Sequence, residues 1–198
     1  MRFPPRIVIA SRNPGKIREI RAICADWPVE WLTHEDRRWP EVVEEGETYL
    51  DNARLKARAV ARATGEAALA DDSGIEVDAL GGAPGPRSAR YAGEGATDEQ
   101  NLRALLTALG GVPPERRTAR YRAVAVAAWP DGREAAAEGT CEGRLREEPV
   151  GAGGFGYDPI FEPEGYGRTM AQLAPEEKDR ISHRGRALRA LGAALAGG

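Results

Sequence analysis

The sequence predicts an α/β fold built on one mixed β-sheet with flanking helices. Two observations carry this prediction. Short apolar, β-branched runs alternate along the 198 residues with segments of helical periodicity, and two long predicted strands late in the chain are joined by a turn tripeptide. Strand–helix alternation is typical of sheets with parallel neighbours, whereas a tight turn joins antiparallel strands. Because no low-complexity linker interrupts the pattern, we expect a single domain over residues 1–198.

The first elements follow from apolar spacing and turn residues. Residues 7–10 are a β-branched run typical of a buried strand, and Asn13-Pro14-Gly15 marks a turn. Isoleucines then recur at helical spacing over residues 16–25. Residues 29–32 are expected to form a second strand, and residues 33–46 to be irregular and acidic.

The middle of the chain repeats this order. An apolar face over residues 47–64 predicts a helix, which Thr64-Gly65 ends. Two strands are expected at residues 67–70 and 75–80. Asp, Ser and Gly between them are ordinary turn material, and Gly and Pro over residues 81–95 indicate a loop.

The last third begins with a capping-box pattern from Thr97 to Gln100, which opens a helix reaching about residue 109. Strands over 121–129 and 134–144 form the predicted hairpin around Pro130-Asp131-Gly132. Residues 151–158 are a glycine-rich loop, and Ser182 is expected to cap a C-terminal helix carrying Leu188 and Leu191.

Composition excludes several classes of protein. A hydrophobic content of 41% and a net charge of -3 argue against a disordered chain and against a basic nucleic-acid-binding body. Two cysteines and two histidines cannot assemble the usual zinc cluster. No apolar stretch approaches the ~18 residues of a membrane span, and the N-terminal apolar run is too short for a signal peptide. We therefore expect a cytoplasmic protein with no nucleic-acid or membrane partner.

Four segments could carry chemistry. The first, Ser11-Arg12-Asn13-Pro14-Gly15-Lys16, lies where a strand meets a helix N-terminus, whose unpaired N–H groups and dipole favour an anion. Gly15 permits close backbone approach, Lys16 adds positive charge, and Ser11 and Asn13 can orient a phosphate or sugar. A plain turn with Asn13 as N-cap is the alternative, and the P-loop spacing is missing.

The second segment is Asp71-Asp72-Ser73-Gly74. Adjacent residues of an extended strand point to opposite sides, so at most one of Asp71 and Asp72 faces a given cleft. Carboxylates near strand ends lie where α/β proteins usually bind ligands, and Mg²⁺ is commonly held by one or two of them together with substrate phosphates. The alternative is an ordinary tight turn.

The third segment, residues 153–158, sets Phe155 and Tyr157 among three glycines, so that either ring could stack on a base and Asp158 could accept from a ring N–H. Rings that fill the core are the alternative. In the fourth, residues 178–184, His183 and Arg184 fall in a first helical turn, where cations oppose the dipole and a bound anion or polar base would offset the cost. A solvated basic surface is the alternative.

In series, these segments resemble the inosine triphosphate (dITP/XTP) pyrophosphatase family, which acts on noncanonical purine nucleoside triphosphates. The resemblance covers almost the whole chain. The matching residues are 11–16, 45–49, 52–57, 70–74, 80–85, 88–91, 153–160, 176–178 and 181–185.

The resemblance implies an elongated mixed sheet with two lobes and the nucleotide between them, usually in a homodimer. It implies Mg²⁺-dependent hydrolysis of dITP, ITP and XTP to the monophosphate and pyrophosphate, which cleanses the nucleotide pool. Asp72 would be the proton acceptor and a metal ligand, with Glu44 as our choice of second ligand among Glu41, Glu44 and Glu45. Residues implied to bind the substrate are Ser11, Arg12, Asn13, Pro14, Gly15, Lys16, Ser73, Phe155, Gly156, Tyr157, Asp158, Lys178, His183 and Arg184.

Chemistry then suggests how such a site works. Water attacks the α-phosphorus, Asp72 orients or deprotonates it, and Mg²⁺, Lys16 and Lys178 neutralise the leaving pyrophosphate. Donors including His183 and Arg184 favour a 6-keto purine over adenine; the rejection of guanine, which shares that keto group, is not explained. The alternatives are a Maf-like pyrophosphatase acting on modified pyrimidine or ordinary triphosphates, and a nucleotide-binding module without catalysis.

Lysine usage gives one more hint. The chain has 25 Arg and 3 Lys, and Lys16, Lys56 and Lys178 all fall inside the motif segments. A compact ammonium suits a crowded phosphate site better than a planar guanidinium, so these positions are interpreted as needing lysine chemistry.

Overall fold

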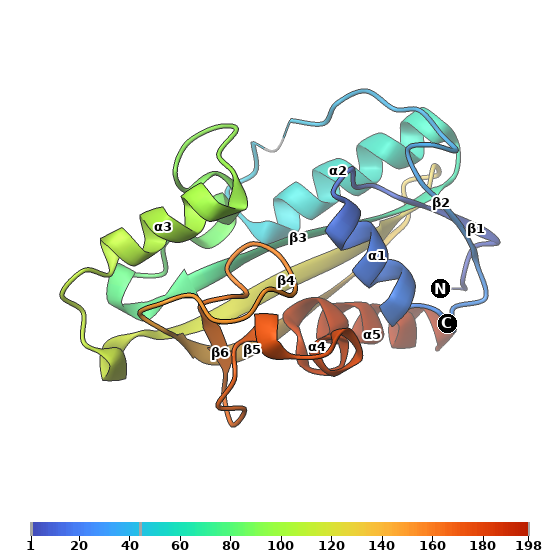
Figure 1. Ribbon diagram of the computed structural model, residues 1–198. Coiled ribbons are helices and arrows are strands. Elements are labelled where there is room, and N and C mark those ends of the chain that lie inside the picture. The colour runs from blue at the N-terminus through green and yellow to red at the C-terminus, as the bar shows by residue number, and fades with distance from the viewer. Residues whose placement is uncertain (1, 44, 198) are drawn as a thin grey trace. The chain divides into compact units, whose positions relative to one another are not determined.

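The computed structural model describes residues 2–43 and 45–197, and within them six strands and five α-helices are formed (Figure 1). In chain order they are β1 (Arg6–Ile9), α1 (Pro14–Ile23), β2 (Glu30–Leu32), α2 (Tyr49–Thr64), β3 (Ala67–Val77), α3 (Asp98–Ala108), β4 (Thr118–Ala128), β5 (Glu134–Leu145), β6 (Phe161–Pro163), α4 (Pro175–Ile181) and α5 (His183–Ala196). The predicted α/β class is confirmed. None of these helices is long and apolar enough to cross a membrane.

The strands form one mixed sheet in the order β2-β1-β3-β4-β5-β6. β1 pairs in parallel with both β2 and β3, and β5 pairs antiparallel with β6. β4 and β5 are neighbours, and the Trp129 N–H donates to the Arg133 carbonyl across the turn that joins them. The hairpin predicted at Pro130-Asp131-Gly132 is thus confirmed, and so is the mixed sheet.

The chain folds into two compact units, each assembled from separate stretches of sequence. Unit 1 contains Met1–Asp72, Ala123–Gly139 and Arg184–Gly198, and unit 2 contains Ser73–Arg122 and Thr140–His183. The chain passes from one unit to the other at Asp72–Ser73 and again at His183–Arg184, inside two of the motifs. The single domain and the nucleotide position between lobes stay predictions.

Unit 1 has a core on each face of its strands, because successive side chains of a strand alternate in direction. On one face, Ile7, Ile9 and Leu69 pack with residues of α1 and α5, including Ile20, Leu188 and Leu191. On the other face, Val8, Ala68 and Ala70 pack with α2 through Ala53, Ala57, Val60 and Ala61. The helical periodicity read from the sequence therefore corresponds to two helical layers around the strands of this unit.

Unit 2 has a core of its own. Leu102, Leu105 and Leu109 of the α3 region pack with Ile75 and Val77 of β3. Tyr121, Tyr157, Phe161 and Met170 belong to the same cluster. Thr97 caps α3, and Gln100 completes the capping box that the sequence predicts. Tyr157 belongs to the glycine-rich loop, so this loop is anchored to the core of unit 2.

One expectation about β3 is wrong. Two strands with a turn at residues 71–74 were expected, but a single strand runs from Ala67 to Val77 through both aspartates. Asp, Ser and Gly favour turns when their polar groups face water, whereas Asp71 and Asp72 here are buried and paired with cations. The strand β6 and the helix α4 had no counterpart in the prediction, and the stretch 81–95 contains the 3₁₀ segment Gly85–Arg90 rather than loop alone.

The small residues of α2 provide a test of how tightly that helix packs. Ala57 is fully buried against the sheet, whereas Ala63, on the same helix, is exposed. We expect Ala57→Leu to overpack the interface and to lower the free energy of unfolding by about 1–3 kcal/mol. Ala63→Leu makes the same chemical change in water and should alter it by less than about 0.5 kcal/mol. Urea unfolding of both variants measures the difference, and equal effects would show that the packing of α2 is not tight.

Candidate active site

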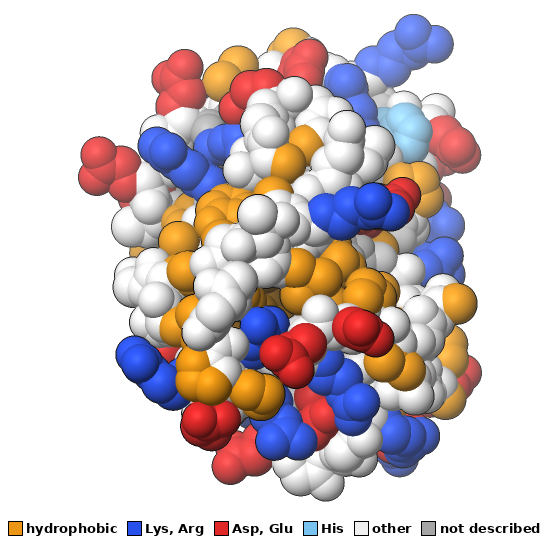
Figure 2. Space-filling view, turned by 60° about the vertical axis from the view of Figure 1, so that its left-hand side comes forward, with side chains coloured by type: hydrophobic (Ala, Val, Ile, Leu, Met, Phe, Trp, Pro, Cys, Tyr) orange, Lys and Arg blue, Asp and Glu red, His pale blue; other side chains and the backbone are white. Residues whose placement is uncertain are grey.

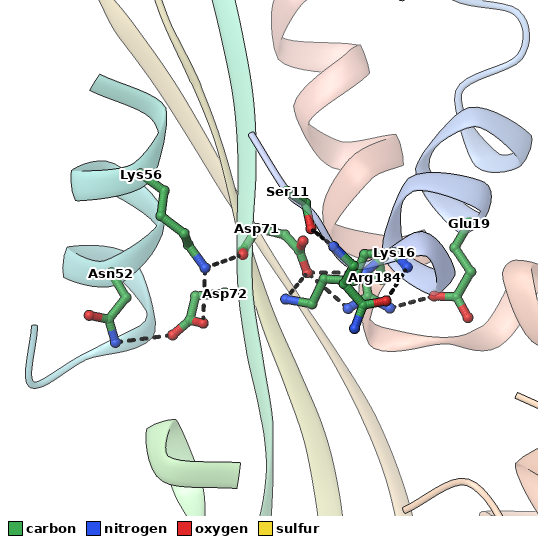
Figure 3. Close-up of polar contacts among 9 residues, drawn as sticks. Ser11, Lys16, Glu19, Asn52, Lys56, Asp71, Asp72 and Arg184 are labelled. Carbon is green, nitrogen blue, oxygen red and sulfur yellow. Dashed lines mark hydrogen bonds and ion pairs between the residues drawn. The ribbon is translucent and has the colours of Figure 1, made fainter. Parts of the chain in front are cut away.

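β3 directs two neighbouring carboxylates to opposite faces of the sheet in unit 1. Asp71 continues the row of Leu69 and faces α1 and α5, whereas Asp72 continues the row of Ala70 and faces α2 (Figure 3). Both are buried. The predicted division of the pair is confirmed. They lie inside β3 rather than at its end, although the β1–β3 pairing stops at Ile9 and Leu69, so the aspartates follow the carboxyl end of β1.

Asp72 is held by two residues of α2. The Asn52 side-chain amide donates to Asp72 Oδ2 at 3.2 Å, and the Lys56 ammonium lies 3.4 Å from Asp72 Oδ1. Lys56 also donates to the Asp71 carbonyl oxygen at 2.9 Å. Asn52 is itself oriented, because its Oδ1 accepts the Gly46 N–H at 2.8 Å. A methyl group at Gly46 would come within 2.7 Å of that same oxygen, so the close approach requires glycine.

Asp71 belongs to a buried ion cluster. Arg184 Nε and Nη2 donate to Asp71 Oδ2 at 3.0 and 2.9 Å, and Lys16 Nζ lies 3.4 Å from the same oxygen. The third nitrogen of the guanidinium, Nη1, pairs with Glu19 of α1. Asp71 Oδ1 is buried and has no hydrogen-bond partner within the described ranges. The cluster explains how two cations tolerate burial, since each lies beside a carboxylate.

The proton affinities of this cluster follow from burial and charge. Burial would raise the pKa of Asp71, but Arg184 and Lys16 outweigh it and hold that pKa well below its ordinary value. Burial lowers the pKa of Lys16; Lys56 and Arg184 act in the same direction, and Asp71 compensates in part. Burial opposes the charge on Arg184, yet Asp71 and Glu19 raise the pKa of its guanidinium. Asp71 and Arg184 therefore stay charged, and Lys16 is the cation whose charge is least supported.

The segment Ser11–Lys16 forms the start of α1. Asn13 is the N-cap, with its side chain accepting the Lys16 N–H at 3.1 Å, and Pro14 begins the helix. Ser11 Oγ accepts the Asn13 N–H at 3.2 Å. Arg12, Asn13 and Pro14 are exposed. The N-cap alternative is thus confirmed as local structure, and it leaves the helix terminus open to solvent; phosphate binding there stays a prediction.

In unit 2, the glycine-rich loop is built around the buried carboxylate of Asp158. The Phe155 N–H donates to Asp158 Oδ2 at 2.9 Å, and the Lys178 ammonium lies 2.6 Å from the same oxygen. Lys178 also lies over the Phe155 ring, 4.8 Å from its centroid. Gly154 has a φ of 71°, and a methyl group there would come within 2.0 Å of Asp158 Oδ2. Glycine is therefore required at 154 for the loop to close on Asp158.

The two rings of this loop differ in environment. Tyr157 is 4% exposed and donates its hydroxyl to the Ser88 carbonyl at 2.7 Å, so the core-filling alternative holds for it. Burial raises the pKa of that phenol. Phe155 is partly exposed, and the neighbouring Gly156 N–H donates to Asp98 at 2.8 Å. Phe155 is thus the ring with a face near solvent.

The alternative of a solvated basic surface for the fourth segment is wrong. Lys178, His183 and Arg184 are all buried, with 6%, 5% and 2% exposure. The His183 ring lies parallel to the Tyr121 ring, with centroids 4.5 Å apart and an interplanar angle of 7°. The cost of cations in a first helical turn is met for Arg184 by two buried carboxylates, a partnership that no sequence pattern indicated.

Each of the three lysines contacts an aspartate of the motif segments. Lys16 pairs with Asp71, Lys56 with Asp72 and Lys178 with Asp158. Exposed ion pairs are instead made by arginine, as where Arg120 contacts Asp78 and Glu142 at 2.9 and 3.1 Å. Basic and acidic side chains are interspersed on the face shown in Figure 2. The inference that lysine occurs where its compact charge is needed is consistent with these contacts.

The predicted site residues thus fall into two sets. Unit 1 holds Ser11, Arg12, Asn13, Pro14, Gly15, Lys16, Asp72 and Arg184, and unit 2 holds Ser73, Phe155, Gly156, Tyr157, Asp158, Lys178 and His183. Glu44 lies outside the described residues. Within the ranges 2–43 and 45–197, no group of three His, Cys, Asp or Glu side chains could hold a metal ion. Glu19 and Tyr121 lie outside the motif segments, and the contacts of Asn52 and Lys56 with Asp72 were not visible in any local pattern.

Comparison with known proteins places this geometry in a family. A dITP/XTP pyrophosphatase of Streptomyces coelicolor is 51% identical over 189 residues, with 94% of both chains covered. One from Thermus thermophilus is 52% identical over 188 residues, covering 94% of this chain and 89% of the relative. The solved structure of a HAM1 protein from Coxiella burnetii matches with a TM-score of 0.88 at 39% identity, covering 98% of this chain and 99% of that one. The Ham1 family model matches residues 7–194, and the chain belongs to the Ham1 family.

Proposed function

We propose that this protein hydrolyses dITP, ITP and XTP to the monophosphate and pyrophosphate in a Mg²⁺-dependent reaction, and so cleanses the nucleotide pool. One observation carries the proposal: Asp71 and Asp72 are adjacent and buried but take different partners, and Asp71 lies in an ion cluster with the Arg184 guanidinium. Asp72 is held by an amide and an ammonium on the other face. A carboxylate oriented in this way suits a proton acceptor and metal ligand.

The phosphate end of the substrate is assigned to the start of α1. This terminus carries the positive end of the helix dipole and is exposed at Arg12 and Asn13, and Lys16 follows in its first turn. Because burial lowers the pKa of Lys16, a phosphate beside it would stabilise the charged form. Asp71 pairs with Lys16 at this position and is itself held by two N–H donors of Arg184, so we assign Arg184 a positioning role rather than a contact with the base.

The residues present fit Mg²⁺. Mg²⁺ prefers oxygen ligands and is usually held by one or two carboxylates and substrate phosphates, so the lack of a three-ligand cluster among the described residues does not count against it. Asp72 and Glu44 would hold the ion. When bound, it would neutralise charge on the phosphate oxygens and polarise the reacting phosphorus.

The reaction itself needs three things from the chain. Asp72 accepts a proton from the water that attacks the α-phosphorus. The Lys16 ammonium and the dipole of α1 stabilise the charge that develops on the leaving pyrophosphate. Asn52 and Lys56 fix the Asp72 carboxylate through both of its oxygens, so the carboxylate needs little reorganisation when the water attacks the phosphorus.

The base is assigned to the set in unit 2. Lys178 and His183 bring side-chain nitrogen donors to this set, and Lys178 lies beside the loop residues Phe155 and Asp158. Donors favour the 6-keto oxygen of hypoxanthine and xanthine and leave the amino group of adenine without an acceptor. The partly exposed Phe155 offers a stacking surface. The homodimer and the cytoplasmic location stay predictions.

A nucleotide panel tests the proposal. With Mg²⁺, pyrophosphate release from ITP, dITP and XTP should exceed that from ATP and dTTP by about 10²-fold or more in kcat/KM, because donors oppose the adenine amino group. Chelation of Mg²⁺ should remove the activity. Preferred turnover of dTTP would favour a Maf-like enzyme, and nucleotide binding without pyrophosphate release would favour a binding module.

Substitutions of the two aspartates should affect kcat and the free energy of unfolding to different degrees. Asp72→Asn removes the proton acceptor, so kcat for ITP should fall by about 10²–10⁴. Lys56 then faces a neutral amide, so the free energy of unfolding should also fall, but by less than in Asp71→Asn, where both Lys16 and Arg184 lose their anionic partner. Asp71→Asn leaves Arg184 and Lys16 with a neutral neighbour in the interior and should lower the free energy of unfolding by about 3 kcal/mol. Urea unfolding and single-turnover rates on both variants measure this. An Asp72→Asn enzyme with wild-type turnover would remove Asp72 from the chemistry.

Charge-preserving changes test the need for lysine. Lys178→Arg must fit a guanidinium into the space beside Asp158 and Phe155, and Lys16→Arg must do so beside Asp71. We expect kcat/KM for ITP to fall at least about tenfold in each, because the fork cannot reproduce the contacts of a compact ammonium. Arg120→Lys, on an exposed ion pair, is the matched control and should retain activity. Full turnover in both site variants would show that positive charge alone suffices.

A further inference from the structure

Tyr121 of β4 contacts two motifs that the sequence separates widely. Its ring is stacked on His183, and its hydroxyl lies 3.4 Å from Asp158 Oδ1. All three residues belong to unit 2. Because the proposed function assigns His183 and Asp158 to the base, one side chain joins the start of α5 to the glycine-rich loop.

We propose that Tyr121 is a positioning residue for recognition of the purine base, acting through His183 and Asp158. This inference rests on the proposed function and adds to it a residue that lies in none of the motif segments. Tyr121 does not itself touch the base in this account. Its effect is to set the direction in which the neighbouring donors point.

The Tyr121 ring orients His183 by stacking on it. Its ring is stacked parallel to that of Tyr121, with an interplanar angle of 7° and centroids 4.5 Å apart. Both nitrogens of an imidazole lie in the ring plane, so a stacked neighbour restricts the directions available to them. His183 is 5% exposed, and a buried donor that is fixed in direction discriminates between a keto and an amino group. Loss of the stack should leave the donor present and its direction undefined.

The Tyr121 hydroxyl also helps to orient Asp158. Oδ2 already receives the Phe155 N–H at 2.9 Å and Lys178 at 2.6 Å. The Tyr121 hydroxyl faces the other oxygen, Oδ1, so the carboxylate is held from both sides. Since Lys178 depends on this carboxylate for its position, removal of the hydroxyl should loosen Lys178 and the loop together.

Tyr121 is itself held in place by burial and packing. It is 7% exposed and lies in the long strand β4. Its ring makes an edge contact with the Phe161 ring, with centroids 4.7 Å apart and an interplanar angle of 61°. A side chain on a strand and against a second ring is a firmer support than one on a loop. The alternative is that Tyr121 only fills the core. That role needs the ring alone, whereas the positioning role also needs the hydroxyl.

Kinetics should distinguish these roles. The base is remote from the α-phosphorus, so loss of its orientation removes binding shared by ground state and transition state and raises KM more than it lowers kcat. We expect Tyr121→Phe to raise KM for ITP by about 3–10-fold, the range for one hydrogen bond. Tyr121→Leu, which also removes the stack, should raise KM further and reduce the ITP/ATP ratio of kcat/KM. Tyr166, partly buried against the same core, supplies matched controls as Tyr166→Phe and Tyr166→Leu.

A spectroscopic measurement tests the geometry without turnover. The chain has two histidines, His34 and His183, so a His34→Gln variant assigns their ring proton resonances. The stacked tyrosine should shift the His183 signals upfield; Tyr121→Phe should retain this shift and Tyr121→Leu should abolish it. A wild-type protein inactive on ITP and XTP would overturn the proposed function while leaving the upfield shift in place. Active, folded Tyr121 variants with wild-type KM and ITP/ATP ratio would overturn the positioning role alone.

Discussion

The burial of two adjacent carboxylates in β3 is the constraint from which the site follows. A strand sends neighbouring side chains to opposite faces, so Asp71 and Asp72 each need partners from a different layer of unit 1. Buried charges of this kind are stable only when they are paired and hydrogen-bonded. On one face the partners are Arg184 and Lys16, and on the other they are Asn52 and Lys56. The packing of α1, α5 and α2 on the sheet and the pairing of the aspartates therefore depend on each other.

This arrangement gives the two carboxylates different properties. Asp71 Oδ2 accepts the Nε and Nη2 donors of the Arg184 guanidinium. The pKa of Asp71 is held low, so it remains a fixed anion. Asp72 instead contacts the Asn52 amide and the Lys56 ammonium. Asp71 pairs with Lys16 and Arg184, and the proposed function therefore assigns proton transfer and metal binding to Asp72. A pair that looks symmetric in the sequence is thus divided by the face that each member occupies.

The sequence was sufficient for the alternation of strands and helices, for the hairpin and for the opposite directions of Asp71 and Asp72, because all three depend on local periodicity or turn chemistry. It failed where tertiary pairing overrode local preference. The stretch 71–74 has turn composition but lies inside β3, since its aspartates find cations from α1, α2 and α5. The partners Glu19 and Asn52 could not be predicted either. They occupy unremarkable helix positions, and only the fold brings Glu19 to Arg184, 165 residues away.

The same reasoning explains why the fourth segment was open to a surface interpretation. Lys178, His183 and Arg184 look like an exposed basic run, yet each has a distinct buried partner: Asp158, Tyr121 and Asp71. The chain also changes unit at His183–Arg184, so one short motif contributes an aromatic contact to unit 2 and an ion pair to unit 1. Asp72–Ser73 does the same in β3. Residues at such crossing points must satisfy two cores at once, which restricts their chemistry more than either core alone would. These two of the four crossings fall inside motifs assigned to the substrate, so at these positions the fold and the proposed chemistry impose constraints together.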